Sequence, residues 1–133
     1  MDERCNILVV NDHDERRRML VNLIQREIKP QLCVEADSVD SASETLKRQS
    51  VSFAIVEIRP GSRKGIKLAE SIKLRCPTLP ILAVSIEQDN FKYVNNPDKE
   101  VKEDGLNRIL SGIRYMNSLT KSGISGFTVA VNI

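Results

Sequence analysis

Four polar residues, Asn11, Asp12, Glu57 and Ser85, stand at the ends of short apolar runs in the sequence. If those runs are neighbouring parallel strands, their carboxyl ends meet at one edge of a sheet. Open α/β sheets bind their ligands in the crevice at that edge. An amide, two carboxylates and a hydroxyl would then share one pocket. The sequence therefore predicts a polar binding or catalytic site at this edge of the sheet.

Simpler interpretations exist for the individual residues. Glu57 could be a solvated acid paired with a nearby cation such as Arg59, Arg63 or Lys64. His13, the only histidine, could take part in acid–base or metal chemistry, but a lone histidine without converging partners favours an exposed loop position. No glycine-rich phosphate loop and no nucleophile–base pair is present in the sequence.

The elements that would position this pocket follow from hydrophobic periodicity. Apolar runs typical of buried strands alternate with amphipathic stretches typical of helices, and each helix has a start or stop signal. Asp14 can cap the first helix, and Ser38 or Asp40 can begin the second. The predicted strands are residues 6–10, 32–34, 52–56 and 79–84, and the predicted helices are residues 14–28, 38–46 and 66–74. This alternation predicts an α/β domain with a doubly wound parallel sheet and helices on both faces.

The last third of the chain is less regular. Residues 88–103 are polar and predict an irregular insertion, and apolar residues at helical spacing between 106 and 119 predict a further helix. Residues 126–131 predict the fifth strand. A competing strand at residues 91–94 follows residue 84 too closely for a parallel crossover, which needs a dozen residues or more.

Bulk properties fit one ordinary globular domain. The 133 residues are 41% hydrophobic and 29% charged, with a formal net charge of +2. So small a net charge predicts neither direct nucleic-acid binding nor membrane binding, and no apolar stretch resembles a signal peptide or a membrane span. Cys5, Cys33 and Cys76 form no C-x-x-C pair, which favours buried free thiols and a cytoplasmic location.

The ordered motifs resemble those of response regulator receiver domains, which have a flavodoxin-like (CheY-like) fold with a five-stranded parallel sheet. The first strand with Asn11 and Asp12 resembles the family's acidic opening segment. The separation of Glu57 from Gly65 matches the family's spacing from its aspartate to a glycine. Residues 80–85 and 123–131 resemble the family's fourth and fifth strands.

The resemblance implies a two-component or phosphorelay signalling module and assigns roles to individual residues. Receivers transfer a phosphoryl group from a histidine kinase to their own aspartate, with Mg²⁺ held by nearby acids. Glu57 stands at the phosphoacceptor position, and Asn11, Asp12 and Glu57 would form a weak Mg²⁺ site. Ser85 and Phe127 stand at the switch positions that sense the phosphoryl group.

Several family positions are altered. Glu57 replaces the aspartate and is longer by one methylene, Asn11 replaces an acid, and Pro60 comes one residue early. Ala130 and Val131 stand where the family has its charge-stabilising lysine and the proline after it. Because in-line attack depends on placement to within about 1 Å, these changes together predict a pseudo-receiver that is not an enzyme and is not phosphorylated in the usual way.

The leading hypothesis is therefore a regulatory module that acts by binding a protein: a sensor histidine kinase, a phosphotransfer protein, an output domain or a second copy of itself. The alternatives are an active Mg²⁺-dependent phosphoacceptor and a flavodoxin-like ligand-binding domain. The basic run at residues 16–18 is either a solvated helix face or a docking face. The family's final helix would be missing after residue 131, which would expose apolar surface on the face of the first helix.

Overall fold

The computed structural model describes residues 5–59, 61–86 and 103–133. In the last of these ranges, the side chains are described only from residue 107 onward. The elements in chain order are β1 (Asn6–Val10), α1 (Asp14–Glu27), β2 (Leu32–Ala36), α2 (Val39–Arg48), β3 (Phe53–Glu57), α3 (Lys64–Arg75), β4 (Ile81–Ser85), α5 (Glu103–Lys121) and β5 (Thr128–Asn132). Among the described helices, none combines the length and the apolarity that crossing a membrane requires.

The strands form one parallel five-stranded sheet in the order β2-β1-β3-β4-β5. The predicted α/β fold with helices on both faces is confirmed, and the preferred fifth strand is present, beginning two residues later than expected. The competing strand at residues 91–94 lies outside the described residues. So does the insertion expected at residues 88–103, apart from Glu103, which begins α5.

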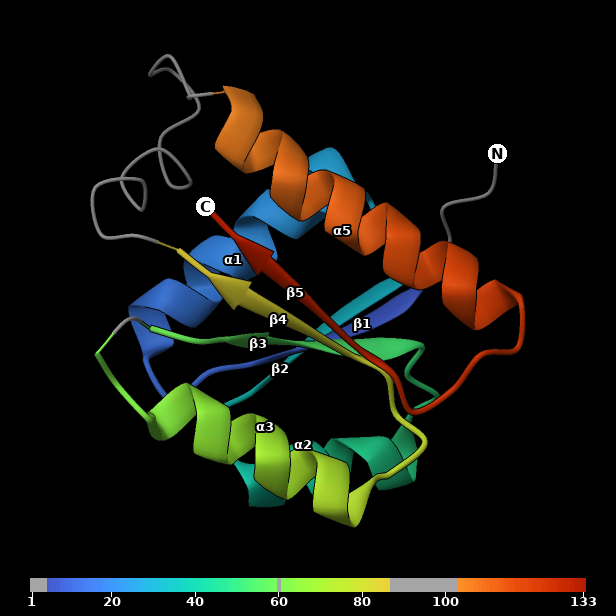
Figure 1. Ribbon diagram of the computed structural model, residues 1–133. Helices are drawn as coiled ribbons and strands as arrows, with labels where there is room; N and C mark the ends of the chain where they lie inside the picture. Colours follow the sequence, from blue (N-terminus) through green and yellow to red (C-terminus); the bar gives the residue numbers. More distant parts are fainter. Residues whose placement is uncertain (1–4, 60, 87–102) are drawn as a thin grey trace.

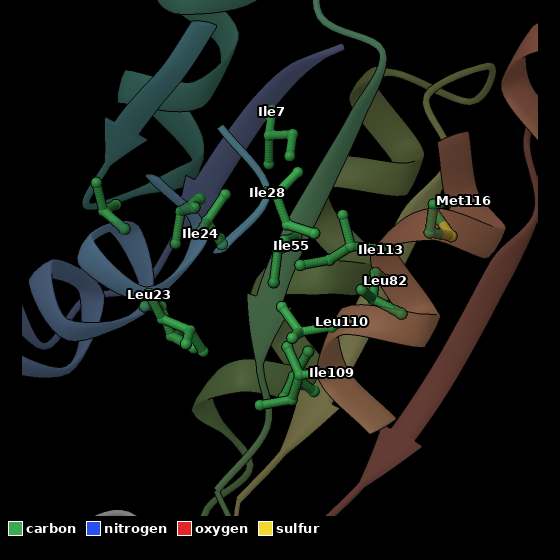
Figure 2. Packing of buried hydrophobic residues seen from close by; sticks show 14 of the residues in the cluster. Ile7, Leu23, Ile24, Ile28, Ile55, Leu82, Ile109, Leu110, Ile113 and Met116 are labelled. Carbon is green, nitrogen blue, oxygen red and sulfur yellow. The ribbon is translucent and has the colours of Figure 1, made fainter. Parts of the chain in front are cut away.

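Each face of the sheet carries its own apolar core. On one face α1 and α5 pack over residues such as Ile7, Ile55 and Leu82, with Leu23 and Ile113 from the two helices (Figure 2). On the other face α2 and α3 cover the alternate residues of the same strands. Figure 1 shows the two helix layers above and below the sheet. The β1 and β3 strands are buried on both faces, which is why their sequences are apolar without alternation.

Two details of the helices differ from expectation. The cap of α1 is His13, whose Nδ1 accepts from the Arg16 amide at 3.3 Å, and Asp14 is the first helical residue. In α3 only Ile72 is fully buried, whereas Leu74 is 84% exposed and Ile66 is exposed as well. The predicted apolar residues Ile66 and Leu74 are therefore not part of the buried face of α3, because they lie on the side of the helix away from Ile72.

The described part of the β4–β5 connection lies on an unexpected face of the sheet. The chain steps in the same direction across the sheet from β3 to β4 as from β4 to β5. The α3 helix of the first step lies on the α2 face, whereas α5 of the second lies on the α1 face (Figure 1). The rule that such crossovers are right-handed would place the connecting helices of both steps on the same face. The described part of the second connection, α5, instead lies on the opposite face from α3.

This placement changes what covers the sheet. The apolar surface expected on the α1 face for want of a final helix is not exposed, because α5 covers it through Ile109, Leu110, Ile113 and Met116. Gly112 makes the close approach possible, since a Cβ there would lie 2.9 Å from a methyl of Val131.

The three cysteines are free, as expected; Cys5 is buried, whereas Cys33 and Cys76 are half-buried. Burial, with smaller contributions from Glu35 and Cys5, raises the pKa of Cys33 from 9.0 to about 12. Near neutral pH the reactive thiolate of Cys33 should therefore be about 1,000-fold scarcer in the folded protein than in the unfolded chain. We expect alkylation of Cys33, followed by peptide mass spectrometry, to be slower in buffer than in urea by a similar factor. Equal rates in the two solvents would contradict this assignment.

Candidate functional site

The carboxyl ends of β1 and β3 bring the predicted polar residues to one edge of the sheet. Asn11 directly follows β1, and Glu57 is the last residue of β3 and pairs in register with Val84. Ser85 ends β4 at the same edge, one residue beyond the partner of Glu57. Asn11 and Glu57 are the buried polar residues of the described chain. The expected meeting of strand ends therefore occurs.

Glu57 is the centre of this edge, and its carboxylate is saturated by the protein. Its Oε1 accepts from Asn11 Nδ2 at 2.7 Å and from Arg16 Nε at 2.8 Å. Its Oε2 accepts from Arg16 Nε at 2.9 Å and from Arg16 Nη2. The side chain of Glu57 is 1% exposed and that of Arg16 is 13% exposed. A buried carboxylate is costly unless it is paired and hydrogen-bonded, and both conditions are met here.

Arg16 reaches Glu57 because the start of α1 is fixed to the loop that follows β1. Asn11 Oδ1 accepts from the His13 amide at 2.9 Å, and His13 in turn caps α1 at Arg16. Arg17 reinforces the same loop by donating to the Asn11 carbonyl at 2.8 Å. Asn11 thus connects the loop to Glu57, with its amide nitrogen toward the carboxylate and its oxygen toward the helix.

The other two arginines of the basic run bind acids at the edge strand. Arg17 pairs with Glu35 of β2 at 3.1 Å and with Asp14 at 2.8 Å, and Arg18 pairs with Glu35 at 3.1 Å. Burial alone would lower the pKa of Arg17, but hydrogen bonds and charge attraction from Asp14 and Glu35 outweigh it and raise that pKa above its ordinary value. The interpretation of residues 16–18 as a solvated face is therefore wrong for Arg16 and Arg17, and fits only Arg18, which is 66% exposed.

A metal ion does not fit the donor set in this arrangement. Both oxygens of Glu57 face the Arg16 guanidinium, and Asn11 uses its oxygen for His13. Asp12 is 47% exposed and lies 3.9 Å from an Arg59 nitrogen, which is a loose ion pair. Within the described ranges, no cluster of three or more acidic, histidine or cysteine side chains could hold a metal. A cation could enter only if Arg16 left.

The remaining family positions lie farther from Glu57. Phe127 precedes β5 and its carbonyl accepts from Ile81, so it stands at the amino end of the β4–β5 pairing. Its side chain packs against the core on the α1 face. Ala130 pairs in register with Ala83 and is exposed. The cation beside Glu57 is thus Arg16 of α1, and not Arg59, Arg63 or Lys64, which are the basic residues near Glu57 in the sequence.

The structure explains why the residue at position 65 is a glycine. A Cβ at Gly65 would lie 2.3 Å from the Glu57 carbonyl oxygen and 3.0 Å from the Ile58 Cα. These contacts are with backbone, which cannot rotate away. The first turn of α3 therefore packs directly on the strand end that carries the carboxylate.

We expect Gly65→Ala to lower the free energy of unfolding by at least about 2 kcal/mol, because the added methyl forces α3 or the end of β3 to move. Urea denaturation measures this change. Lys67→Ala, at an exposed position of the same helix, is the control and should stay within about 0.5 kcal/mol of the wild type. Equal stabilities of the two variants would show that the contact can relax.

A double-mutant cycle should reveal strong coupling between Arg16 and Glu57. Arg16→Ala leaves a buried carboxylate without its cation and should cost about 3 kcal/mol, and Glu57→Gln should cost somewhat less. The double variant should lose less than the sum of the two, with a coupling energy above about 1.5 kcal/mol. Arg18→Ala, a neighbouring exposed arginine, should cost under about 1 kcal/mol. Additive losses at positions 16 and 57 would contradict the pairing.

Comparison with known proteins agrees with this architecture. The sequence profile described as "Response regulator receiver domain" matches residues 7–121. No curated protein matches the chain in a sequence search.

Among solved structures, the chain is similar to the N-terminal domain of a response regulator/sensory box/GGDEF 3-domain protein from Carboxydothermus hydrogenoformans. The TM-score is 0.60 at 14% identity, covering 90% of this chain and 98% of that one. It is also similar to the receiver domain of NtrX from Brucella abortus, with a TM-score of 0.59 at 22% identity over 85% of this chain and 98% of the other. A sensor protein from Polaromonas sp. JS666 matches with a TM-score of 0.61 at 16% identity, over 88% and 98% of the two chains. These structures support the fold, and the profile match over most of the sequence shows that the chain belongs to the response regulator receiver domain family.

Proposed function

We propose that this receiver domain is a pseudo-receiver, a signalling module that acts by binding other proteins and does not take up a phosphoryl group at Glu57. The observation that carries this proposal is the saturation of the Glu57 carboxylate by Arg16 and Asn11. A phosphoacceptor needs a carboxylate oxygen free to attack phosphorus. Here each oxygen already accepts two hydrogen bonds, and an arginine covers the approach.

The charge around the site supports the same conclusion. Phosphoryl transfer needs cations that stabilise the transferring group, and receiver domains typically use Mg²⁺ for this. In this chain the Arg16 guanidinium lies where a cation would meet Glu57, and Ala130 offers no charge at the family's lysine position. Asp12 is a further carboxylate at this edge, and it forms a loose ion pair with Arg59. Among the residues that the structure describes, the carboxylate of Glu57 is therefore occupied and no lysine stands at the family's lysine position.

The pair also argues against Glu57 as a permanent imitation of a phosphoryl group. A phosphoryl group presents nearly two negative charges and three acceptor oxygens to the switch residues. Glu57 presents one charge, and Arg16 neutralises it within hydrogen-bonding distance. The site thus holds a neutral ion pair. We infer a single fixed conformation of the strand ends, which a protein partner recognises without a phosphorylation cycle.

Receiver domains as a family interact with kinases, phosphotransfer proteins and output domains, and we propose that this chain binds a partner of that group. Its location would be the cytoplasm, where these systems operate. The exposed Arg18, which pairs with Glu35 of β2, is a candidate contact for such a partner.

Mass spectrometry after incubation with Mg²⁺ and acetyl phosphate tests the proposal. We expect no added phosphoryl mass on the wild type, because Arg16 blocks both the metal and the nucleophile. A stable phosphoryl adduct that disappears in Glu57→Gln would refute the pseudo-receiver.

A second experiment tests whether Arg16 takes the place of a metal. Mg²⁺ should leave the thermal midpoint of the wild type unchanged but raise that of Arg16→Ala, in which Glu57, Asp12 and Asn11 become available. The matched controls are Arg18→Ala, which should resemble the wild type, and Arg16→Ala/Glu57→Gln, which should lose the Mg²⁺ response. A response of the wild type equal to that of Arg16→Ala would show that Arg16 does not exclude the ion.

A further inference from the structure

The outer edge of β5 carries backbone hydrogen-bonding groups that no strand pairs with in the described part of the chain. The Phe127 carbonyl accepts from Ile81, and the Ile133 amide donates to Ser85, so alternate residues from 127 to 133 bond to β4. The amides and carbonyls of Thr128, Ala130 and Asn132 must therefore point away from the sheet. Within the described residues no strand pairs with this edge, and the Asn132 carbonyl accepts a hydrogen bond from Arg108 Nη1 at 3.3 Å.

The other edge strand is protected, whereas β5 is not. Proteins blunt free strand edges with charges, prolines or bulges, because an open edge pairs with other chains. In β2, Glu35 and its ion pairs with Arg17 and Arg18 put charge on the edge. By contrast, β5 has the sequence TVAVN, without a charge, a proline or a glycine. Its side chains at Thr128, Ala130 and Asn132 are exposed.

The β5 sequence is also complementary to itself. In an antiparallel pair centred on Ala130, each Val129 lies opposite Val131 of the other copy, and each Thr128 lies opposite Asn132. The outward groups then give about six main-chain hydrogen bonds from three opposed pairs, with an amide of the second copy replacing Arg108 at the Asn132 carbonyl. The valines extend the apolar core on the α1 face, where both already pack, and the polar pairs stay on the other face. No like charges oppose each other.

A five-residue seam is smaller than a stable interface requires, and α5 supplies further surface. Gly112 lies against Val131, next to the centre of the seam, and the groove beside β5 is lined by Arg108, Ser111 and Ala130. Two copies of α5 would therefore flank the two-fold axis in antiparallel orientation. Arg108 and the 54% exposed Tyr115 lie on either side of Gly112 in α5, at about equal distances along the helix. Because Gly112 lies near the two-fold axis of the dimer, the symmetry brings Arg108 of one copy toward Tyr115 of the other.

From the free backbone edge, its self-complementary sequence and the flanking helix, we infer that the chain forms a symmetric homodimer by antiparallel β5–β5 pairing. The partner is a second copy of this chain, and the two sheets become one continuous sheet. This inference does not depend on the pseudo-receiver proposal, because Asn11 and Arg16, which bind the Glu57 carboxylate, do not lie on β5.

Sedimentation of the full chain over a range of concentrations tests the dimer. Ala130→Lys places two charges opposite each other at the axis and should weaken dimerisation at least about tenfold. Gln25→Lys, at an exposed position of α1, adds the same charge and should leave dimerisation unchanged. A wild type that stays monomeric, or a dimer that Ala130→Lys does not weaken, would overturn the inference.

Two further measurements test the register and do not depend on how well Ala130→Lys folds. In the wild type, hydrogen exchange followed by NMR should show protection of the amides of Thr128, Ala130 and Asn132 that increases with concentration. Ala130→Cys should form an intermolecular 130–130 disulfide on oxidation, since opposed Cα atoms lie about 5.5 Å apart, and Gln25→Cys should not. Rapid exchange of these three amides at all concentrations, or a failure of Ala130→Cys to cross-link, would overturn the β5–β5 pairing.

Discussion

A carboxylate that is almost fully buried at the end of a central strand must be neutralised, and Arg16 meets that requirement for Glu57. The arginine can do so only if α1 begins close to the end of β3. Asn11 sets this distance, because it donates to Glu57 and accepts from the turn that starts the helix. Moving any one of the three groups would leave a buried polar atom without a partner. The geometry of the whole sheet edge therefore follows from one charge.

The same requirement explains the surroundings of the pair. Three consecutive arginines in the first turn of a helix oppose the helix dipole, which disfavours cations there. Each arginine is compensated by an acid: Glu57 for Arg16, Glu35 and Asp14 for Arg17, and Glu35 for Arg18. These contacts bind α1 to β2 and β3 together. The tertiary ion pairs therefore stabilise α1, although three cations near its amino end are locally unfavourable.

The sequence predicted most of the fold because buried parallel strands carry a strong local signal. The strands through β4 have apolar runs with turn signals around them, and α1 and α5 have regular apolar stripes. The meeting of Asn11 and Glu57 also followed from strand order. The partner of Glu57 did not, because Arg16 lies far from it in sequence and nothing local links the two. The one available signal was the basic run at a helix start, which needed acids nearby. The face on which α5 packs was equally hidden, since both faces of the sheet accept an apolar stripe.

The position of α5 on the α1 face has a consequence for the order of folding. The β1 to β4 part of the sheet, with α1, α2 and α3, closes through shorter crossovers, whereas the connection from β4 to β5 is the longest between consecutive strands and includes α5. Closing that longer loop costs chain entropy before any β4–β5 bond forms. The β5 strand is also held by one neighbour, and the family match ends at residue 121, before it begins. We therefore regard β5 and its connection as a late and separately opening unit of the domain, distinct from the cooperative block that contains the Arg16–Glu57 pair.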